Sequence, residues 1–191
     1  GYLGFTDPPG DVHIKYGYIA NDPYYVIKIA SGFYKNSDIG LPTGNGMMLA
    51  FEAKTGVPQC LLRDEGYLTD LRTGLAGTIA GKHLGPQHIE QIGIIGTGIQ
   101  ARLQLECLGH TNSCRKAMVW GRSKEKAKQY QSDMEQLGYS ISIATHIEEV
   151  PASCNLIVTT TPSEAPLLYA KDIRPGTHIT AMGSDTDGKQ E

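Results

Sequence analysis

The sequence predicts an α/β fold in which a doubly wound parallel sheet follows part of a smaller α+β region. Five short apolar runs in the second half alternate with helical or turn segments, as parallel strands with crossovers do. Closely spaced strands in the first half indicate an antiparallel sheet. Because Gly85-Pro86 ends a helix between the two halves, we predict one domain over residues 1–86 and a second over 87–191.

The first region is predicted to contain three strands followed by one helix. The strands cover residues 24–30, 46–53 and 59–63, and Lys54-Thr55-Gly56 forms a turn before the third. The helix covers 67–84 and carries Gly74, Gly77 and Gly81. Since each glycine weakens an isolated helix by roughly 1 kcal/mol relative to alanine, these glycines indicate close packing against another element.

Two cations of this region fall where solvent-exposed charge is not expected. Strand alternation places Lys28 on the same face as Val26 and Ala30. Helical spacing places Arg72 on the same face as Leu75 and Ile79. Burying an unpaired cation is costly, so both side chains are predicted to be partly buried and to meet an anion, either a protein carboxylate or a bound ligand.

The second region opens with an apolar strand at 92–95 that runs into Gly96-Thr97-Gly98-Ile99-Gln100-Ala101. Gly96 permits a tight turn, Gly98 lets the backbone approach a pyrophosphate, and Ala101 lets the following helix pack closely on the strand. The N–H groups and the positive dipole end of that helix would face the phosphates. The segment therefore predicts a dinucleotide site in a Rossmann-type fold.

The elements that follow extend this fold. A helix face at 102–108 leads through a polar turn to the next strand, and the further strands are predicted at 117–120, 141–145, 155–160 and 177–182. A parallel sheet would place a crossover helix after the last strand. Because the chain stops at Glu191 without one, we expect a C-terminally incomplete domain in a fragment of a longer protein.

Composition and charge narrow the function classes. The net charge of −3 comes from interspersed signs, which gives no basic stripe for nucleic acid, and no apolar run is long enough to span a membrane. A small molecule is therefore the expected partner. The four cysteines form no CxxC pair and the histidines show no ligand spacing, so we predict no metal site and reduced thiols in a cytoplasmic protein.

Several separate motifs occur in an order that resembles the ornithine cyclodeaminase and mu-crystallin family over nearly the whole chain. They are Lys28 in Val-Ile-Lys-Ile, Leu41-Pro42-Thr43-Gly44-Asn45-Gly46, Thr69-Asp70-Leu71-Arg72-Thr73, the glycine turn through Arg102, and the segment from Gly183 to Glu191. Members of that family are larger. The resemblance implies that this chain is the middle portion, with only part of a substrate-binding and dimerisation domain, and that the protein is a homodimer.

The resemblance also implies chemistry at the α-carbon of an amino acid or imino acid, with a nicotinamide accepting or donating hydride. Lys28 and Arg72 would hold the substrate carboxylate, and the implied catalytic residues are Asp185, which would handle the proton, and Lys28. Cofactor contacts are implied for Thr43, Gly96, Thr97, Gly98, Ile99, Gln100, Ala101, Gly121, Arg122, Ser123, Thr160, Thr161, Met182 and Gly183.

The second strand departs from the cyclodeaminase pattern. NAD enzymes usually carry an acid roughly 20 residues beyond the glycine turn, whereas this strand ends in Trp120-Gly121-Arg122-Ser123 with Lys124 and Lys126 close by. Such a basic cluster favours a 2′-phosphate, so NADP(H) is the predicted cofactor and NAD(H) the alternative. The cluster could also be only a solvated helix start.

Three functions remain open at this point. An imine reductase or amino-acid dehydrogenase fits a site that selects NADPH, because the oxidised cofactor must exchange for fresh reductant. An ornithine cyclodeaminase, a lyase that forms proline and ammonia, would instead recycle a bound NAD within one turnover. A mu-crystallin-like protein that binds NADPH or another ligand is the third.

Overall fold

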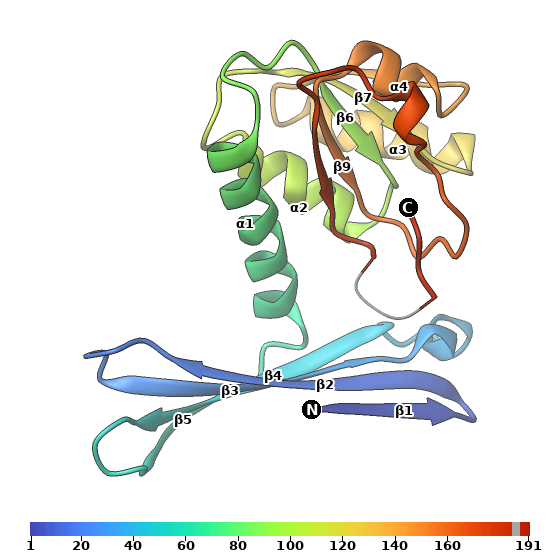
Figure 1. Ribbon diagram of the computed structural model, residues 1–191. Coiled ribbons are helices and arrows are strands. Elements are labelled where there is room, and N and C mark those ends of the chain that lie inside the picture. Colours follow the sequence, from blue (N-terminus) through green and yellow to red (C-terminus); the bar gives the residue numbers. More distant parts are fainter. Residues whose placement is uncertain (185–187) are drawn as a thin grey trace. The chain divides into compact units, whose positions relative to one another are not determined.

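The computed structural model describes residues 1–184 and 188–191, with Tyr34 described by its backbone only. The chain divides into two compact units, Gly1–Thr69 and Asp70–Glu191. Over the described residues each unit contains one five-stranded sheet, and the two sheets have different topologies (Figure 1). Asp185, the predicted catalytic acid, lies outside the described residues.

The first unit is an antiparallel meander whose strands pair in chain order. The strands are β1 (Tyr2–Thr6), β2 (Pro9–Tyr18), β3 (Tyr24–Gly32), β4 (Gly44–Glu52) and β5 (Pro58–Leu62), and a 3-10 helix, η1 (Tyr34–Ile39), joins β3 to β4. The three predicted strands and their antiparallel arrangement are confirmed. The sequence analysis missed β1 and β2, although β2 carries a clear alternation at Val12, Ile14, Tyr16 and Tyr18.

One face of this sheet is apolar and exposed. The register places Tyr16 opposite Ile27, and Leu61 opposite Leu49, and directly opposite residues share a face. Tyr25 and Phe51 stack there with ring centroids 5.0 Å apart. We call this surface the apolar face; its exposed side chains are Leu3, Phe5, Tyr16, Tyr18, Met47 and Leu61.

The second unit is a parallel sheet with strand order β10-β9-β6-β7-β8. Its strands are β6 (Ile92–Ile95), β7 (Lys116–Trp120), β8 (Ser140–Ile143), β9 (Leu156–Thr159) and β10 (His178–Ala181). The chain leaves β6 toward β7 and β8 and then returns to the other side of β6, so the order reverses between β6 and β9. The predicted Rossmann-type doubly wound sheet is confirmed, and ligands of such sheets bind at this switch point.

Helices cover both faces of the parallel sheet. They are α1 (Tyr67–Leu84), α2 (Ile99–Leu108), α3 (Lys124–Glu135) and α4 (Glu149–Ser153), with a 3-10 turn, η2 (Ala170–Asp172). One buried cluster joins Ile94 to Leu105 of α2 and Tyr130 of α3. A second joins Ile95 to Val150 of α4. Two separate apolar clusters, one per face, are what a doubly wound sheet requires.

Helix α1 packs against α2 through its glycines. A side chain at Gly77 would collide with Gln104, and one at Gly74 would press on Leu103 and Cys107. The predicted close packing is confirmed. This contact groups the helix with the second unit from Asp70 onward, whereas the sequence analysis placed the boundary at the far end of the helix, after residue 86.

Candidate functional site

The glycine turn connects β6 to α2 in a conformation that requires glycine. Gly96 has φ +119°, in the left-handed region, and its N–H donates to the Trp120 carbonyl at 2.9 Å. A Cβ at Gly96 would collide with the Thr160 hydroxyl. At Gly98, by contrast, an added Cβ would meet nothing within 4 Å. The turn is therefore fixed behind Gly96 and opens onto free space at Gly98, where a phosphate can approach the first N–H groups of α2.

A cavity of about 1040 Å³ lies in front of this turn. It occupies the carboxyl ends of β6, β7 and β9, where doubly wound sheets bind ligands. Its volume is that of a pocket for a large ligand. The lining residues are Gly96 to Ile99, Arg102, Trp120 to Ser123, Lys126, Thr160 to Ala165 and Leu167.

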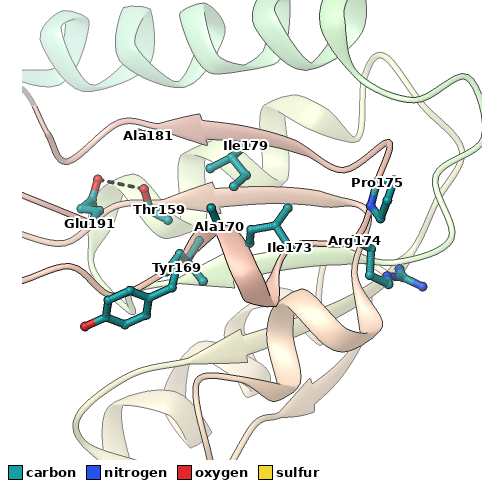
Figure 2. Close-up of a pocket in the computed structure, with 10 residues that line it drawn as sticks. Thr159, Tyr169, Ala170, Ile173, Arg174, Pro175, Ile179, Ala181 and Glu191 are labelled. Atoms are coloured by element: carbon teal, nitrogen blue, oxygen red, sulfur yellow. Dashed lines mark hydrogen bonds between the residues drawn. The ribbon is translucent and has the colours of Figure 1, made fainter.

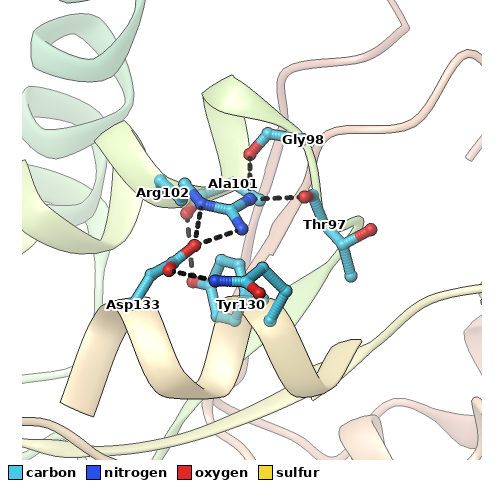
Figure 3. Close-up of polar contacts among 7 residues, drawn as sticks. Thr97, Gly98, Ala101, Arg102, Tyr130 and Asp133 are labelled. Atoms are coloured by element: carbon cyan, nitrogen blue, oxygen red, sulfur yellow. Dashed lines mark hydrogen bonds and ion pairs between the residues drawn. The ribbon is translucent and has the colours of Figure 1, made fainter. Parts of the chain in front are cut away.

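Arg102 braces the turn from the first helical turn of α2 (Figure 3). Its Nη1 donates to the carbonyl oxygens of Thr97 at 2.5 Å and Gly98 at 3.2 Å. Its Nε and Nη2 donate to Asp133 of α3 at 2.9 and 2.5 Å, and the guanidinium lies 5.3 Å from the Tyr130 ring centroid. These hydrogen bonds from Arg102 hold the pKa of the Asp133 carboxyl below its usual value. Arg102 thus ties the carbonyls of the turn to Asp133 of α3.

The start of α3 forms a basic end of the cavity. Arg122, Ser123 and Lys126 all contribute to the lining. Ser123 caps the helix, since its hydroxyl accepts the Lys126 N–H at 3.2 Å and donates to Glu125 at 2.8 Å. A hydrogen bond from its own backbone N–H, and then the one from Ser123, lower the pKa of Glu125. The two cations, Arg122 and Lys126, thus lie beside Ser123, whose hydroxyl already donates a hydrogen bond to the ionised Glu125 carboxylate.

The loop after β9 closes the cavity on its other side. The Thr160 N–H and hydroxyl both donate to the Ile95 carbonyl, at 2.8 and 3.1 Å. Glu191 holds the ends of two strands together, because its carboxylate accepts from the Thr159 hydroxyl, from Thr161 and from the Gly183 N–H, at 2.5 to 2.9 Å. Figure 2 shows Glu191 beside Thr159 at a smaller cavity of about 510 Å³. The sequence analysis missed this role of Glu191.

The structure brings most of the predicted cofactor residues of the second unit together. Those that line the large cavity are Gly96, Thr97, Gly98, Ile99, Gly121, Arg122, Ser123, Thr160 and Thr161. Ala101 is buried, and its carbonyl accepts the Tyr130 hydroxyl at 3.1 Å. The Gln100 side chain is directed toward Asp70 of α1. Met182 packs against the buried cluster that contains Ile94. Arg102 lines the cavity although the sequence analysis gave it no role.

The predicted substrate residues lie on different elements. Lys28 of β3 is 8% exposed, so its predicted burial is confirmed. The predicted burial of Arg72 is wrong, because Arg72 is exposed along with Leu75 and Ile79. The buried stripe of α1 is instead its glycine face, which lets α2 approach more closely than large side chains would allow. Thr43 precedes β4 in the first unit, and its carbonyl accepts the Phe33 N–H at 2.8 Å.

Residues 1–184 and 188–191 contain no group of three His, Cys, Asp or Glu side chains arranged to hold a metal ion. In the same part of the chain, no helix combines the length and the apolar character needed to cross a membrane.

Comparisons with known proteins agree with this fold. A proposed dehydrogenase of Rhizobium meliloti is 42% identical over 99% of this chain and 58% of its own length. The alanine dehydrogenase of Archaeoglobus fulgidus is 38% identical over 88% of this chain and 51% of its own. The chain therefore spans little more than half the length of these curated relatives.

Solved structures match equally well. An archaeal alanine dehydrogenase dimer with bound NAD has a TM-score of 0.90 and 34% identity, covering 100% of this chain and 57% of the other. The Δ1-pyrroline-2-carboxylate reductase of Thermococcus litoralis, in complex with NADH and L-proline, has a TM-score of 0.86 and 29% identity over 94% of this chain and 55% of its own. The profile of the ornithine cyclodeaminase/mu-crystallin family matches residues 2–191, and the chain belongs to that family.

Proposed function

We propose that the protein is a nicotinamide-dependent oxidoreductase that transfers hydride between the cofactor and the α-carbon of an amino acid or cyclic imino acid. The observation that carries this proposal is the cavity of about 1040 Å³ on which the glycine turn and three strand ends converge. A bound nicotinamide dinucleotide would supply the hydride donor or acceptor. The alanine dehydrogenase and pyrroline-2-carboxylate reductase named above support the substrate class.

The residues of the cavity fit a dinucleotide. The open space at Gly98 and the first N–H groups of α2 suit the pyrophosphate, and Arg102 holds the Thr97 carbonyl of the same turn. Thr160 and Thr161 lie along the opposite wall. On the substrate side, Lys28 and Arg72 would hold the carboxylate, for which the planar guanidinium is well suited. Asp185 would hold or accept the proton of the substrate nitrogen.

We propose NADP(H) as the favoured cofactor because Arg122 and Lys126 line the cavity beside Ser123. Calorimetric titration of the full-length protein should give NADPH binding at least tenfold tighter than NADH, about 1.4 kcal/mol. Arg122→Ala should remove most of that difference and leave the NADH affinity unchanged. If the wild-type protein prefers NADH, the NADP(H) assignment is wrong, and the nucleotide balance must then separate an NADH-dependent oxidoreductase from an ornithine cyclodeaminase with bound NAD.

The reaction itself is tested by the nucleotide balance. Net oxidation of NADPH with Δ1-pyrroline-2-carboxylate as the probe is expected, and Asp185→Asn should slow it without weakening cofactor binding. Release of ammonia from L-ornithine with no net change in nucleotide would instead identify a cyclodeaminase. Cofactor binding with neither reaction would leave a ligand-binding protein.

We further propose that two copies of the protein associate through the apolar face. Six large apolar or aromatic side chains on it are exposed, among them Tyr16 at 79% and Leu61 at 59%. A surface of this kind marks an interaction site. The archaeal alanine dehydrogenase of similar fold is itself a dimer. Sedimentation of the full-length protein should show a dimer that Leu61→Glu converts to monomer.

The four free cysteines are in keeping with the cytosol as the compartment of the protein.

A further inference from the structure

Two glutamine side chains cross between helices α1 and α2. The Nε2 of Gln100 donates to Asp70 twice, to its carboxylate Oδ1 at 3.0 Å and to its carbonyl at 3.2 Å. The Nε2 of Gln104 donates to the Thr73 carbonyl at 3.0 Å. We call these four residues the glutamine clasp. All of them belong to the second compact unit.

Packing alone does not explain why the side chains of Gln100 and Gln104 carry amide groups. Gln104 is fully buried, and its Oε1 occupies the volume that a side chain at Gly77 would need. Among the described residues, the buried Oε1 atoms of Gln100 and Gln104 have no hydrogen-bond partner. A buried unpaired carbonyl oxygen is unfavourable, and leucine would fill a similar volume without it. The feature that leucine could not supply is the pair of N–H donors on Nε2, and Gln100 directs both at Asp70.

The clasp joins the two places to which the proposed function assigns ligands. Gln100 lies in the first turn of α2, directly after the glycine turn that faces the cavity. Asp70 lies in the first turn of α1, two positions before Arg72. One side chain therefore links the phosphate-binding turn to the helix that carries the predicted substrate arginine.

We propose that Gln100 is a positioning residue that couples cofactor binding at the glycine turn to the first turn of α1, and thereby places Arg72 for the substrate carboxylate. The cofactor at the glycine turn and the ligand of Arg72 both rest on the proposed function; the hydrogen-exchange test needs only the cofactor and no substrate. Gln100 already holds Asp70 through these two hydrogen bonds, so a ligand that orders the first turn of α2 also restrains the first turn of α1. Displacement of a positioning group by about 1 Å can lower a rate by about 100-fold, so such a link has a kinetic effect.

Amide hydrogen exchange of the full-length protein tests the coupling without any substrate. Saturating NADH should slow exchange in residues 70–74 of the wild-type protein, and Gln100→Ala should lose that protection while keeping protection of the glycine turn. Gln131→Ala is the matched control, because Gln131 is a partly buried helix glutamine whose Nε2 donates to the Ile141 carbonyl at 2.7 Å, away from α1. Protection of α1 that is absent in the wild type, or unchanged in Gln100→Ala, would overturn the proposal.

Two variants at Asp70 keep the test decisive if Gln100→Ala folds poorly. Asp70→Asn retains an oxygen that can accept from Gln100 and should retain the protection, whereas Asp70→Ala should lose most of it. The same result for both variants would show that the hydrogen bond to the side chain does not carry the coupling.

Kinetics then connect the coupling to the substrate. With Δ1-pyrroline-2-carboxylate as the probe, Gln100→Ala should raise KM at least tenfold and change the Kd of NADH less than twofold, while Asp70→Asn stays near wild type. An equal loss in both constants would mean that Gln100 only stabilises the turn, which contradicts the proposal. If the wild-type protein does not reduce the probe, the proposed function fails, and hydrogen exchange still decides the coupling.

Discussion

The two five-stranded sheets differ in how far each one buries its own apolar side chains. Strands β6 and β9 are buried along their whole length, whereas β1 and β5 are exposed along theirs. The buried apolar side chains found in the described residues all lie in the second unit. The difference follows from connectivity, because parallel strands need helical crossovers that cover the sheet, while antiparallel strands can be joined by turns that cover nothing.

The two units also differ in what supports their functional residues: the geometry of a cavity in the second unit, and family resemblance in the first. The cavity of about 1040 Å³ is lined entirely by residues of the closed second unit. Lys28 and Thr43, assigned to substrate and cofactor by family resemblance, lie in the open first unit. A site within one closed unit can be argued from its own geometry. The apolar face of the other unit is explained only by something that covers it.

The largest expected effect comes from truncating a buried side chain of the second unit, and truncation of an exposed side chain of the first unit is the comparison. Ile94→Ala, at a fully buried position, should lower the free energy of unfolding by about 2–5 kcal/mol at every protein concentration. Leu61→Ala, at a position 59% exposed, should cost about 1 kcal/mol, with a size that depends on concentration because the proposed dimer covers it. Urea denaturation at two protein concentrations measures the free energy of unfolding of both variants. A loss in Leu61→Ala that is independent of concentration would argue that this face is simply solvated.

An intermediate effect is expected for Arg102→Ala. Because Arg102 holds the carbonyls of Thr97 and Gly98, its loss should weaken NADH and NADPH equally, by about tenfold or 1.4 kcal/mol. Calorimetry should show the same change for both nucleotides, unlike Arg122→Ala. Leu61→Ala is the control from the open unit and should leave both affinities unchanged. A selective loss of NADPH in Arg102→Ala would mean that Arg102 contacts the 2′-phosphate.

The smallest expected effect concerns pH. Burial lowers the pKa of His178 on β10, so the folded protein favours the neutral ring. Stability from this group is therefore present above the ordinary pKa of about 6.5 and is lost as pH falls through the lower folded value. His178→Asn should flatten the decline in Tm between about pH 7 and pH 5. An unchanged decline would assign it to other groups.

The fold of the second unit was predictable because its signals are local. Each of the five strands is an apolar run bounded by turns, and the glycine turn fixes where the first βαβ unit begins. Helix α1 was predicted to its observed ends, Tyr67 and Leu84. Arg122 and Thr160, which follow directly from strand ends, were predicted to lie at one site, and both line the large cavity.

The remainder depended on packing that no local pattern shows. The exposure of Arg72 was missed because helix periodicity marks large apolar residues, whereas the buried stripe of α1 consists of three glycines and Thr78. Arg102 and Glu191 were missed because their partners, Asp133 and Thr159, are distant in sequence. Gln100 was predicted to meet the cofactor, and its side chain is directed at Asp70, since a motif fixes the backbone of a turn and not the direction of each side chain.

The position of Trp120 gives the molecule an optical property. It is the only tryptophan of the chain, it ends β7, and it lines the large cavity, whereas most of the ten tyrosines lie in the first unit. Light absorbed at the red edge of the protein band therefore excites a single indole beside the glycine turn. Reduced nicotinamide absorbs where indole emits, so energy transfer would report cofactor occupancy from the unlabelled protein.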